Sequence, residues 1–412
     1  MLNIDENLLK AYAKLTVRRG ANVQKGQNLT ITANVRDEYF VKYLVEEAYK
    51  AGARFVRMEW YSDIYDSIRY QNEDKDSMAE LRSYEEEKLK YDLKNLPARI
   101  FVESSDPDAL SLADPDKIAY IQKKRGPLVK KYRKEMDGHY QWTIVGLPGE
   151  EWAKKVFPEL SVNDAMNKLM EAIIHTARLS GDPLVNWQKH SDNLHKKCKL
   201  LNDLSIKNLH YTSKNGTDFR ISLPKEMQFE GGSSFTVEGI EYEANIPTEE
   251  CFTSPDKDTA EGVVYATKPL SVNGNVVSDF GFRFKGGKAV EVIAKTEKEK
   301  KILENLISTD EGASRLGEVA LVPFDSPINE TGILFYNTLY DENACCHIAL
   351  GESFDECIRN YDKLSKEEKE KINLNHSVIH VDFMIGSADL KIEAETYDGK
   401  NVTIFENGTW AI

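Results

Sequence analysis

The chain has 412 residues, 41% of them hydrophobic and 30% charged, a composition typical of globular proteins and a length sufficient for two domains. Its formal net charge of −14 repels nucleic-acid phosphates, so we expect no nucleic-acid partner. No apolar run approaches the ~20 residues of a membrane helix, and residues 1–10 contain no signal-peptide core, so we expect no membrane association and a cytoplasmic location.

The first half of the chain alternates strand-like and helix-like segments. Runs rich in β-branched and aromatic residues occur at 28–33, 54–60, 99–103 and 141–145. Residues 38–50 between the first two runs have the apolar spacing of a helix. This alternation predicts an α/β N-terminal domain with a mostly parallel sheet flanked by helices. The turns carry no GxGxxG fingerprint, and the basic residues between 123 and 134 are predicted to form a solvated helix face.

Two helices are predicted to link the halves, from 161 to 179 and from 182 to 201. From about residue 208 the pattern becomes β-rich. Asn215-Gly216 and Gly286-Gly287 predict tight hairpins, and Asp398-Gly399 and Asn407-Gly408 predict two further turns. Helical patterns return at 296–307 and 366–371. We therefore predict an α+β, β-rich C-terminal domain, with domains at residues 1–200 and 201–412.

Residue types that bind metal concentrate in four short segments of the second half. They are NIPTEECFT (245–253), LGEVALV (316–322), DENACCHIALG (341–351) and HVDFMIG (380–386). Each segment alone is a weak signal. Together they supply several carboxylates and two histidines within one domain, which is enough for two cations.

His380 and Asp382 are two residues apart in a strand-like context, so their side chains project from the same face. Zinc and cobalt accept that pair of ligands, although an isolated HxD is better explained by an edge strand with a polar face. Glu318 interrupts an apolar strand. A carboxylate buried there needs a partner, which is either an arginine or lysine or a metal.

The other two segments also have two interpretations. His347 lies in a run that looks buried, where a lone histidine is more often a hydrogen-bonded core residue than a ligand. Asp341-Glu342 fits the acidic start of a helix. Glu249-Glu250 follows a proline and fits a solvated turn, or else one acid binds metal and the other accepts a proton.

The four segments, in order and with similar spacing, resemble the motif set of the aminopeptidase T and aminopeptidase S family of metallopeptidases. In the first half the similarity includes Glu151-Trp152-Ala153 and Val156-Phe157-Pro158. The resemblance implies an α/β N-terminal domain, a C-terminal catalytic domain and a dimeric exopeptidase that removes N-terminal residues of peptides. It also implies a cofactor of two divalent cations, which are zinc, cobalt or manganese.

Carried over residue by residue, the resemblance assigns the metal ligands as Glu250, Glu318, His347, His380 and Asp382. Glu249 is the candidate catalytic base, and its role is exchangeable with that of Glu250. Seven residues after His347, where the family commonly has a tyrosine, this chain has Phe354.

The resulting hypothesis is hydrolysis of the N-terminal peptide bond by a water that two metals activate. The alternative from another class is a peptide-binding protein of the same fold without turnover, which Phe354 favours. A nucleotide- or phosphate-binding enzyme is a further alternative. Its closest motif, residues 281–288, lacks the GK[ST] ending of a P-loop. A thiol hydrolase would need a cysteine beside His347, and the five cysteines, which form no CxxC pair, are predicted to be reduced core residues. They are Cys198, Cys251, Cys345, Cys346 and Cys357.

Overall fold

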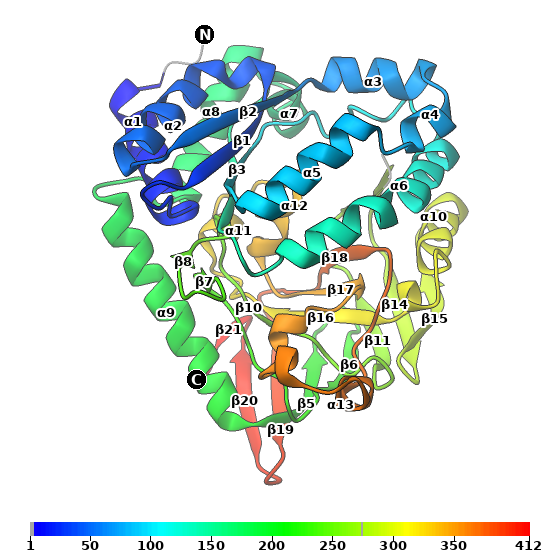
Figure 1. Ribbon diagram of the computed structural model, residues 1–412. Coiled ribbons are helices and arrows are strands. Elements are labelled where there is room, and N and C mark those ends of the chain that lie inside the picture. The colour runs from blue at the N-terminus through cyan, green and yellow to red at the C-terminus, as the bar shows by residue number, and fades with distance from the viewer. Residues whose placement is uncertain (1–3, 273–274) are drawn as a thin grey trace. The chain divides into compact units, whose positions relative to one another are not determined.

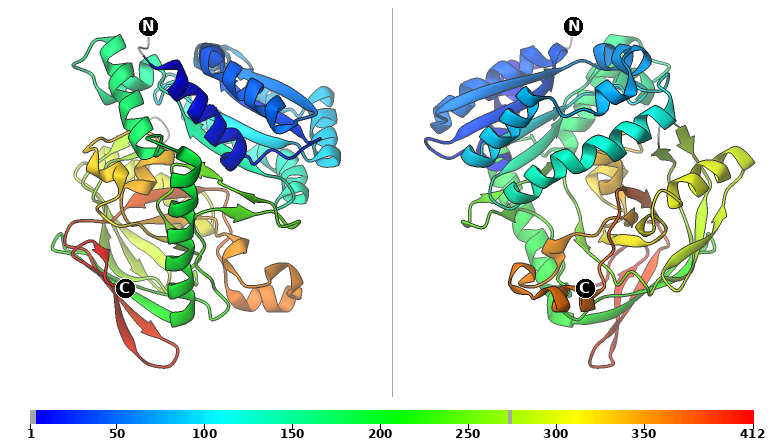
Figure 2. Two further views of the ribbon diagram at one scale, coloured as in Figure 1. Left: turned by 90° about the vertical axis from the view of Figure 1, so that its left-hand side faces the viewer. Right: turned by 45° about the vertical axis from the view of Figure 1, so that its right-hand side comes forward.

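The computed structural model describes residues 4–272 and 275–412 and is drawn in Figures 1 and 2. Residues 1–3, in the segment where we expected no signal peptide, lie outside the described residues. The chain divides into two compact units, one of residues 1–189 and 233–247 and the other of residues 190–232 and 248–412. Helix α9 (Pro183–Leu204) runs through residue 200, and a domain boundary at that residue stays a prediction.

The first unit contains a five-stranded sheet in the order β2-β1-β3-β4-β9, in which all neighbouring strands are parallel. Its strands are β1 (Asn28–Asn34), β2 (Phe55–Tyr61), β3 (Ala98–Glu103), β4 (Trp142–Gly146) and β9 (Asn245–Ile246). The predicted α/β unit with a parallel sheet is confirmed, and the four predicted strands are present. The fifth strand, β9, comes from the start of the first metal-type segment, which sequence analysis did not assign to this sheet.

Helices connect these strands, as Figure 1 shows. They are α1 (Glu6–Leu15), α2 (Glu38–Ala51), α3 (Asp63–Asn72), α4 (Lys75–Ala79), α5 (Ser83–Asn95), α6 (Pro115–Met136), α7 (Glu150–Val156) and α8 (Val162–Thr176). The 3.6-residue spacing in α2 buries Phe40, Leu44 and Ala48. Gly52, with φ of 97°, ends that helix in the left-handed conformation. A two-stranded ribbon of β7 (Ser234–Phe235) and β8 (Glu241–Tyr242) completes the unit.

The second unit contains an eight-stranded antiparallel sheet in the order β15-β14-β11-β6-β5-β19-β20-β21. Its strands are β5 (Ile206–Thr212), β6 (Asp218–Ser222), β11 (Glu261–Tyr265), β14 (Gly281–Lys285), β15 (Lys288–Ile293), β19 (Lys391–Thr396), β20 (Asn401–Glu406) and β21 (Thr409–Trp410). The hairpins predicted at Asn215-Gly216 and Gly286-Gly287 are confirmed as β5–β6 and β14–β15. The hairpin β19–β20, in red, projects from the sheet in both views of Figure 2.

A four-stranded antiparallel sheet in the order β10-β16-β17-β18 lies in the same unit. Its strands are β10 (Cys251–Thr253), β16 (Leu316–Leu321), β17 (His347–Gly351) and β18 (His380–Met384). Each of these four strands comes from one of the four metal-type segments, so the sheet collects residues that are distant in sequence. Phe282 of β14 and Phe280, which directly precedes that strand, pack against Phe383 of β18.

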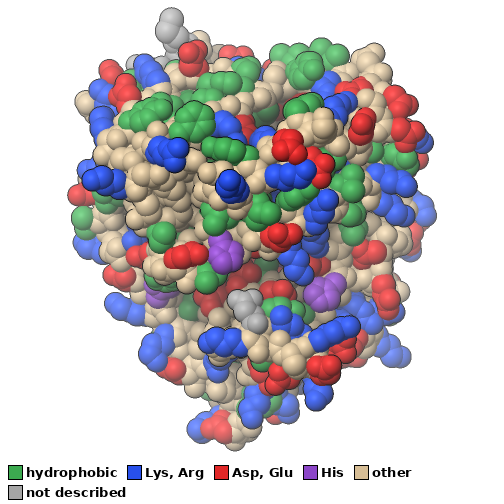
Figure 3. All heavy atoms as spheres, in the orientation of Figure 1, with side chains coloured by type: hydrophobic (Ala, Val, Ile, Leu, Met, Phe, Trp, Pro, Cys, Tyr) green, Lys and Arg blue, Asp and Glu red, His purple; other side chains and the backbone are tan. Residues whose placement is uncertain are grey.

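The remaining elements of the second unit are short. They include β12 (Leu270–Val272), β13 (Asn275–Val277), α10 (Glu297–Ile307), α11 (Pro327–Glu330), α12 (Thr338–Asp341), the 3₁₀ helix η4 (Glu342–Ala344) and α13 (Lys366–Ile372). Among the described residues, no helix is long and apolar enough to span a bilayer. Acidic side chains are interspersed with lysine and arginine over the face shown in Figure 3.

Candidate metal centre

The register of the four-stranded sheet places the predicted ligands on one face. Ala349 of β17 lies opposite Glu318 of β16 on one side and opposite Asp382 of β18 on the other. Residues directly opposite each other in an antiparallel sheet project from the same face. The carboxylates of Glu318 and Asp382 therefore point the same way, with only the methyl group of Ala349 between them.

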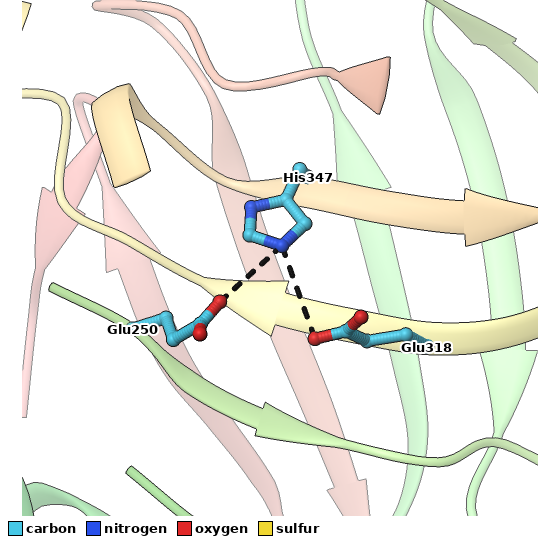
Figure 4. A group of neighbouring side chains, drawn as sticks. All are labelled: Glu250, Glu318 and His347. Carbon is cyan, nitrogen blue, oxygen red and sulfur yellow. Dashed lines mark ion pairs between the residues drawn. The ribbon is translucent and has the colours of Figure 1, made fainter. Parts of the chain in front are cut away.

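Two-residue periodicity adds the histidines to that face. His347 lies two residues before Ala349 on β17, and His380 lies two residues before Asp382 on β18. Glu250 immediately precedes β10. Figure 4 shows Glu250 and Glu318 directed at the imidazole of His347.

A bulge in β16 explains why Glu318 reaches this face. The β16–β17 register shifts by one residue between Leu316 and Glu318, which lets Leu316 enter the hydrophobic core while Glu318 points the other way. Gly317 occupies the bulge. A Cβ atom at that position would lie 2.1 Å from the carbonyl oxygen of Glu352, so the close strand approach requires glycine.

The five predicted ligands meet in two overlapping groups, Glu250–Glu318–His347 and Glu318–His380–Asp382, whose candidate ligand atoms lie within 4.8 Å of one another. The Nε2 atom of His347 is 3.4 Å from Glu250 Oε2 and 3.8 Å from Glu318 Oε1. The Nε2 atom of His380 is 3.1 Å from Glu318 Oε2 and 3.3 Å from Asp382 Oδ1. The Glu318 carboxylate thus pairs with two imidazoles, rather than with the arginine or lysine of the simpler interpretation.

The orientation of His380 fits a metal ligand. Its Nδ1 atom lies 2.8 Å from the carbonyl oxygen of Glu352, which can only accept a hydrogen bond, so Nδ1 carries the proton. The Nε2 atom therefore faces the carboxylates of Glu318 and Asp382, and it is the nitrogen that can bind a metal once its proton is displaced. Histidines that bind metals commonly hold their second nitrogen in this way.

Buried negative charge at the site also fits cations. Burial alone would lower the pKa of His347, but the surrounding carboxylates, Glu250 first, raise it to about 10. Burial likewise opposes the charged form of His380, yet Asp382 and Glu318 raise its pKa to about 11. Burial raises the pKa of Glu318 to about 7. Without a metal, protons therefore supply the positive charge that balances the carboxylates of the cluster. The nitrogen and oxygen donors of the cluster suit a divalent transition metal.

Glu342 is a fourth carboxylate of this cluster that sequence analysis did not assign to the site. Burial raises its pKa well above the ordinary value, and the nearby charges of Asp382, Glu250 and Glu318 act in the same direction. The available sequence signal was a carboxylate five residues before His347, at the start of a run that becomes buried. Sequence analysis places this carboxylate in the acidic start of a helix.

The predicted acidic helix start at Asp341-Glu342 is confirmed, but the helix that Glu342 begins is the short 3₁₀ helix η4. Asp341 ends α12 and its carboxylate accepts hydrogen bonds from the backbone N–H groups of Phe335 and Asn337, at 2.8 and 3.0 Å. The loop before α12 is thus tied to Asp341, whereas the charges that act on Glu342 are those of the site residues.

Glu249 and Glu250 are buried, with 5% and 9% exposure, so the solvated-turn interpretation is wrong. The backbone N–H of Glu249 donates to Asn343 Oδ1 at 2.8 Å. Its Oε2 atom is 3.7 Å from Nε2 of His190, whose ring nitrogen also lies 2.7 Å from the Thr248 carbonyl oxygen. Sequence analysis missed His190, because it lies on α9 and belongs to no metal-type segment.

Phe354 packs beside the centre. Its ring centroid is 4.9 Å from that of His380 and 5.5 Å from that of Phe252. Its backbone N–H donates to Ser254 Oγ at 2.8 Å. The position that holds a tyrosine in the resembling family is therefore adjacent to a candidate ligand in this chain.

Comparisons with known proteins agree over the whole chain. A family profile described as thermophilic metalloprotease (M29) matches residues 5–410. Aminopeptidase AmpS of Bacillus subtilis (strain 168) is 42% identical over 405 residues, which cover 98% of each chain. Aminopeptidase PepS of Streptococcus thermophilus is 38% identical, covering 100% of this chain and 99% of that one. The solved structure of wild-type AmpT from Thermus thermophilus superposes with a TM-score of 0.90 at 35% identity, covering 99% of this chain and 100% of that one.

Proposed function

The chain belongs to the thermophilic metalloprotease family M29 and is a metalloaminopeptidase, and we propose that it cleaves the N-terminal peptide bond of peptides with the help of two divalent cations. The observation that carries the proposal is the convergence of two histidines and several carboxylates on one sheet face, in two groups that share Glu318. Relatives that cover the whole chain are named aminopeptidases, which supports peptides as substrates.

We assign the metal ligands as Glu250, Glu318, His347, His380 and Asp382. When bound, two divalent cations of this kind lower the pKa of water and polarise the carbonyl that is attacked. The protein's own contribution is to fix the donors: the bulge at Gly317 aims Glu318, and the Glu352 carbonyl fixes the tautomer of His380. Zinc, cobalt and manganese all accept this donor set.

Proton transfer is assigned to Glu249. Its neighbour Glu250 pairs with His347, which supports Glu250 as the ligand and leaves Glu249 for the proton from water. The Asn343 side chain holds the backbone of Glu249, and His190 lies beside its carboxylate. A buried base held in this way can pass the proton to the leaving amine. The remaining carboxylate, Glu342, is available to neutralise the free α-ammonium group, which would confine cleavage to N-termini.

A thiol mechanism has no support from the residues next to His347. Burial raises the pKa of Cys345 to about 11 and raises that of Cys346 further. Both thiols are therefore protonated at neutral pH, and a protonated thiol is a poor nucleophile. The Cys346 thiol instead donates to the carbonyl oxygen of Val322 at 3.3 Å.

The test is a panel of aminoacyl p-nitroanilides and short peptides, assayed with purified protein before chelation, after chelation, and after reloading with zinc, cobalt or manganese. We expect release of the N-terminal residue that EDTA abolishes and metal restores. Bound metal without release from any substrate would instead support the non-catalytic peptide-binding alternative, to which the phenylalanine at position 354 points. Release that is indifferent to chelation would contradict the metal assignment.

Two further expectations belong to the same proposal. We propose that the enzyme acts in the cytoplasm as a homodimer, without nucleic-acid partners. The five cysteines are buried and free, which is consistent with a reducing compartment. Light scattering coupled to size-exclusion chromatography tests the dimer, because one chain has a mass of 46.9 kDa and the homodimer has twice that mass.

A further inference from the structure

We propose that the substrate's main chain adds as an extended strand to the outer edge of β18 (His380–Met384), so that the enzyme recognises peptide backbone beside its metal centre. This inference rests on the proposed peptidase function. The occupant is an extended peptide that continues beyond the scissile bond, as opposed to a single aminoacyl group. The inference follows from the direction in which the backbone groups of β18 point.

Hydrogen bonds at the two ends of β18 fix that direction. The Glu352 N–H donates to the Ile379 carbonyl, and the Ile385 N–H donates to the Cys346 carbonyl, each at 2.8 Å. In an antiparallel ladder such bonded pairs alternate with pairs whose N–H and C=O groups point away from the partner. The odd-numbered residues of β18 therefore bond to β17, and the even-numbered residues present their backbone groups on the other side.

The outward groups belong to His380, Asp382 and Met384. The Met384 carbonyl accepts a hydrogen bond from the Thr267 N–H at 2.8 Å, so the edge is already continued there. Over residues 4–272 and 275–412, no backbone–backbone hydrogen bond is present that would occupy the outward N–H and C=O groups of His380 and Asp382. These two residues form an open stretch of edge, which we call the β18 edge.

Side chains at the N-terminal end of the β18 edge are exposed to solvent. The side chain of His380 is 26% exposed, and Val378 just before the strand is 78% exposed. The other edge of the sheet, strand β10, has backbone groups that are already paired, because Phe252 exchanges two backbone hydrogen bonds with Glu230, at 2.8 and 2.9 Å. Of the two outer strands of this sheet, β18 is thus the one that offers unpaired backbone next to the metal centre.

The residues of the β18 edge have two roles at once. Their side chains are assigned as metal ligands on one face of the sheet, while their backbone groups point along the sheet. A strand that pairs with an edge lies about 4.8 Å from it, which sets its peptide bonds close to those ligands. Main-chain pairing supplies affinity without selecting side chains. We therefore infer that the enzyme tolerates many sequences and cleaves substrates more efficiently when main chain continues on the carboxyl side of the scissile bond.

The test uses the intact metal-loaded enzyme and leucyl-trialanine, with release of leucine as the readout. In one analogue an ester replaces the second peptide bond, and in the other an ester replaces the third. An ester removes one N–H donor and leaves the first peptide bond unchanged. Because a paired strand directs alternate residues to the edge, we expect one analogue to lose about tenfold in kcat/KM, the effect of one hydrogen bond. The other analogue should retain the parent value.

Equal kcat/KM values for the parent and both analogues would overturn the inference, and so would an equal loss in both analogues. Leucine p-nitroanilide separates this failure from that of the proposed function, because it offers no main chain beyond the first bond. Hydrolysis of the anilide alongside indifferent analogues leaves the peptidase standing and removes the strand pairing. No release from any of the four compounds would overturn both.

Discussion

The Oε2 atom of Glu318 lies 3.1 Å from Nε2 of His380, across the intervening strand β17. The other oxygen of the same carboxylate, Oε1, lies 3.8 Å from Nε2 of His347. Glu318 therefore joins two donor groups that otherwise have no residue in common. Substitution of this one side chain should disturb both groups at once.

Glu318→Gln and His380→Ala should abolish peptide hydrolysis while the fold survives. Loss of a residue that merely orients a ligand costs about 10–100-fold in metal affinity or activity, so loss of a ligand should leave below about 1% of kcat/KM. Steady-state kinetics after chelation and controlled reloading with metal, together with circular dichroism, measure both parts. Full activity in either reloaded variant would remove that residue from the ligand set.

Glu297→Gln is the matched control for Glu318→Gln. Glu297 is an exposed acid in the first turn of α10, so the same chemical change there should leave kcat/KM within about twofold and shift stability by less than about 0.5 kcal/mol. A comparable loss in the control would show that the assay reports a general effect of lost negative charge.

Glu342→Gln should separate stability from metal binding. Because burial, together with the neighbouring carboxylates, raises the pKa of Glu342 well above the ordinary value, the metal-free fold favours its neutral acid form, which glutamine resembles. The unfolding free energy of the metal-free variant should stay within about 0.5 kcal/mol of the wild type. Metal affinity should fall by about 10–100-fold, since an amide supplies no negative charge. Calorimetry measures both, and unchanged metal affinity would place Glu342 outside the centre.

Metal binding should release protons. Because the pKa values of His347 and His380 are raised to about 10 and about 11, both imidazoles are protonated in the metal-free protein at pH 7. A cation displaces these protons, so affinity should rise as pH rises from 6 to 8 and fall on acidification. Titration calorimetry in buffers of different ionisation enthalpy counts the protons. We expect about two per protein from the imidazoles, with a further contribution from Glu318, whose pKa is raised to about 7. The absence of release would contradict this pairing of charges.

The buried carboxyl group of Asp37 should make the stability of the first unit depend on pH. Burial raises its pKa to about 7, although the Ser104 hydroxyl donates to it at 2.6 Å. The folded state thus holds a proton that the unfolded state releases above pH 3.8. Stability from this group is complete below about pH 4 and is lost as pH rises toward 7, at up to about 1.4 kcal/mol per pH unit. Thermal unfolding of Asp37→Asn between pH 4 and 7 should lack this dependence of stability on pH. An unchanged dependence would contradict the raised pKa of Asp37.

Phe354→Tyr tests the departure from the resembling family. The ring packs against His380, so a hydroxyl there adds a donor near the atoms that develop charge during attack. We expect kcat to rise by about tenfold with a smaller change in KM, the result of one added hydrogen bond. Phe252→Tyr adds the same hydroxyl to the neighbouring ring and should not raise kcat. An unchanged or lower kcat in Phe354→Tyr would show that this enzyme does not use such a donor.

Local patterns were sufficient to predict much of the fold. Period-two and period-3.6 spacing marked the strands of both units and helices such as α2, and glycine turns such as Asn215-Gly216 marked hairpins. The short strand β9 carries no such pattern, because two residues are too few to show a period. Its place in the parallel sheet depends on pairing with β4, which is a contact distant in sequence.

The candidate site was likewise predictable only where local sequence patterns place its residues. Glu318 was recognisable because a carboxylate interrupts an apolar strand, and the i, i+2 spacing of His380 and Asp382 put them on one face. Glu342 lies in a 3₁₀ turn and His190 lies on a long helix, where neither has a local spacing that aims it. Their places follow from tertiary packing alone.

The central claim is that five side chains hold two cations whose presence is required for peptide hydrolysis. Titration of the chelator-stripped protein with zinc, cobalt or manganese, with leucine release measured at each addition, tests it most directly. We predict no activity without metal, a rise that breaks at two equivalents, and no rise in Glu318→Gln. Full activity in the stripped wild-type protein, or a break at one equivalent, would contradict the account.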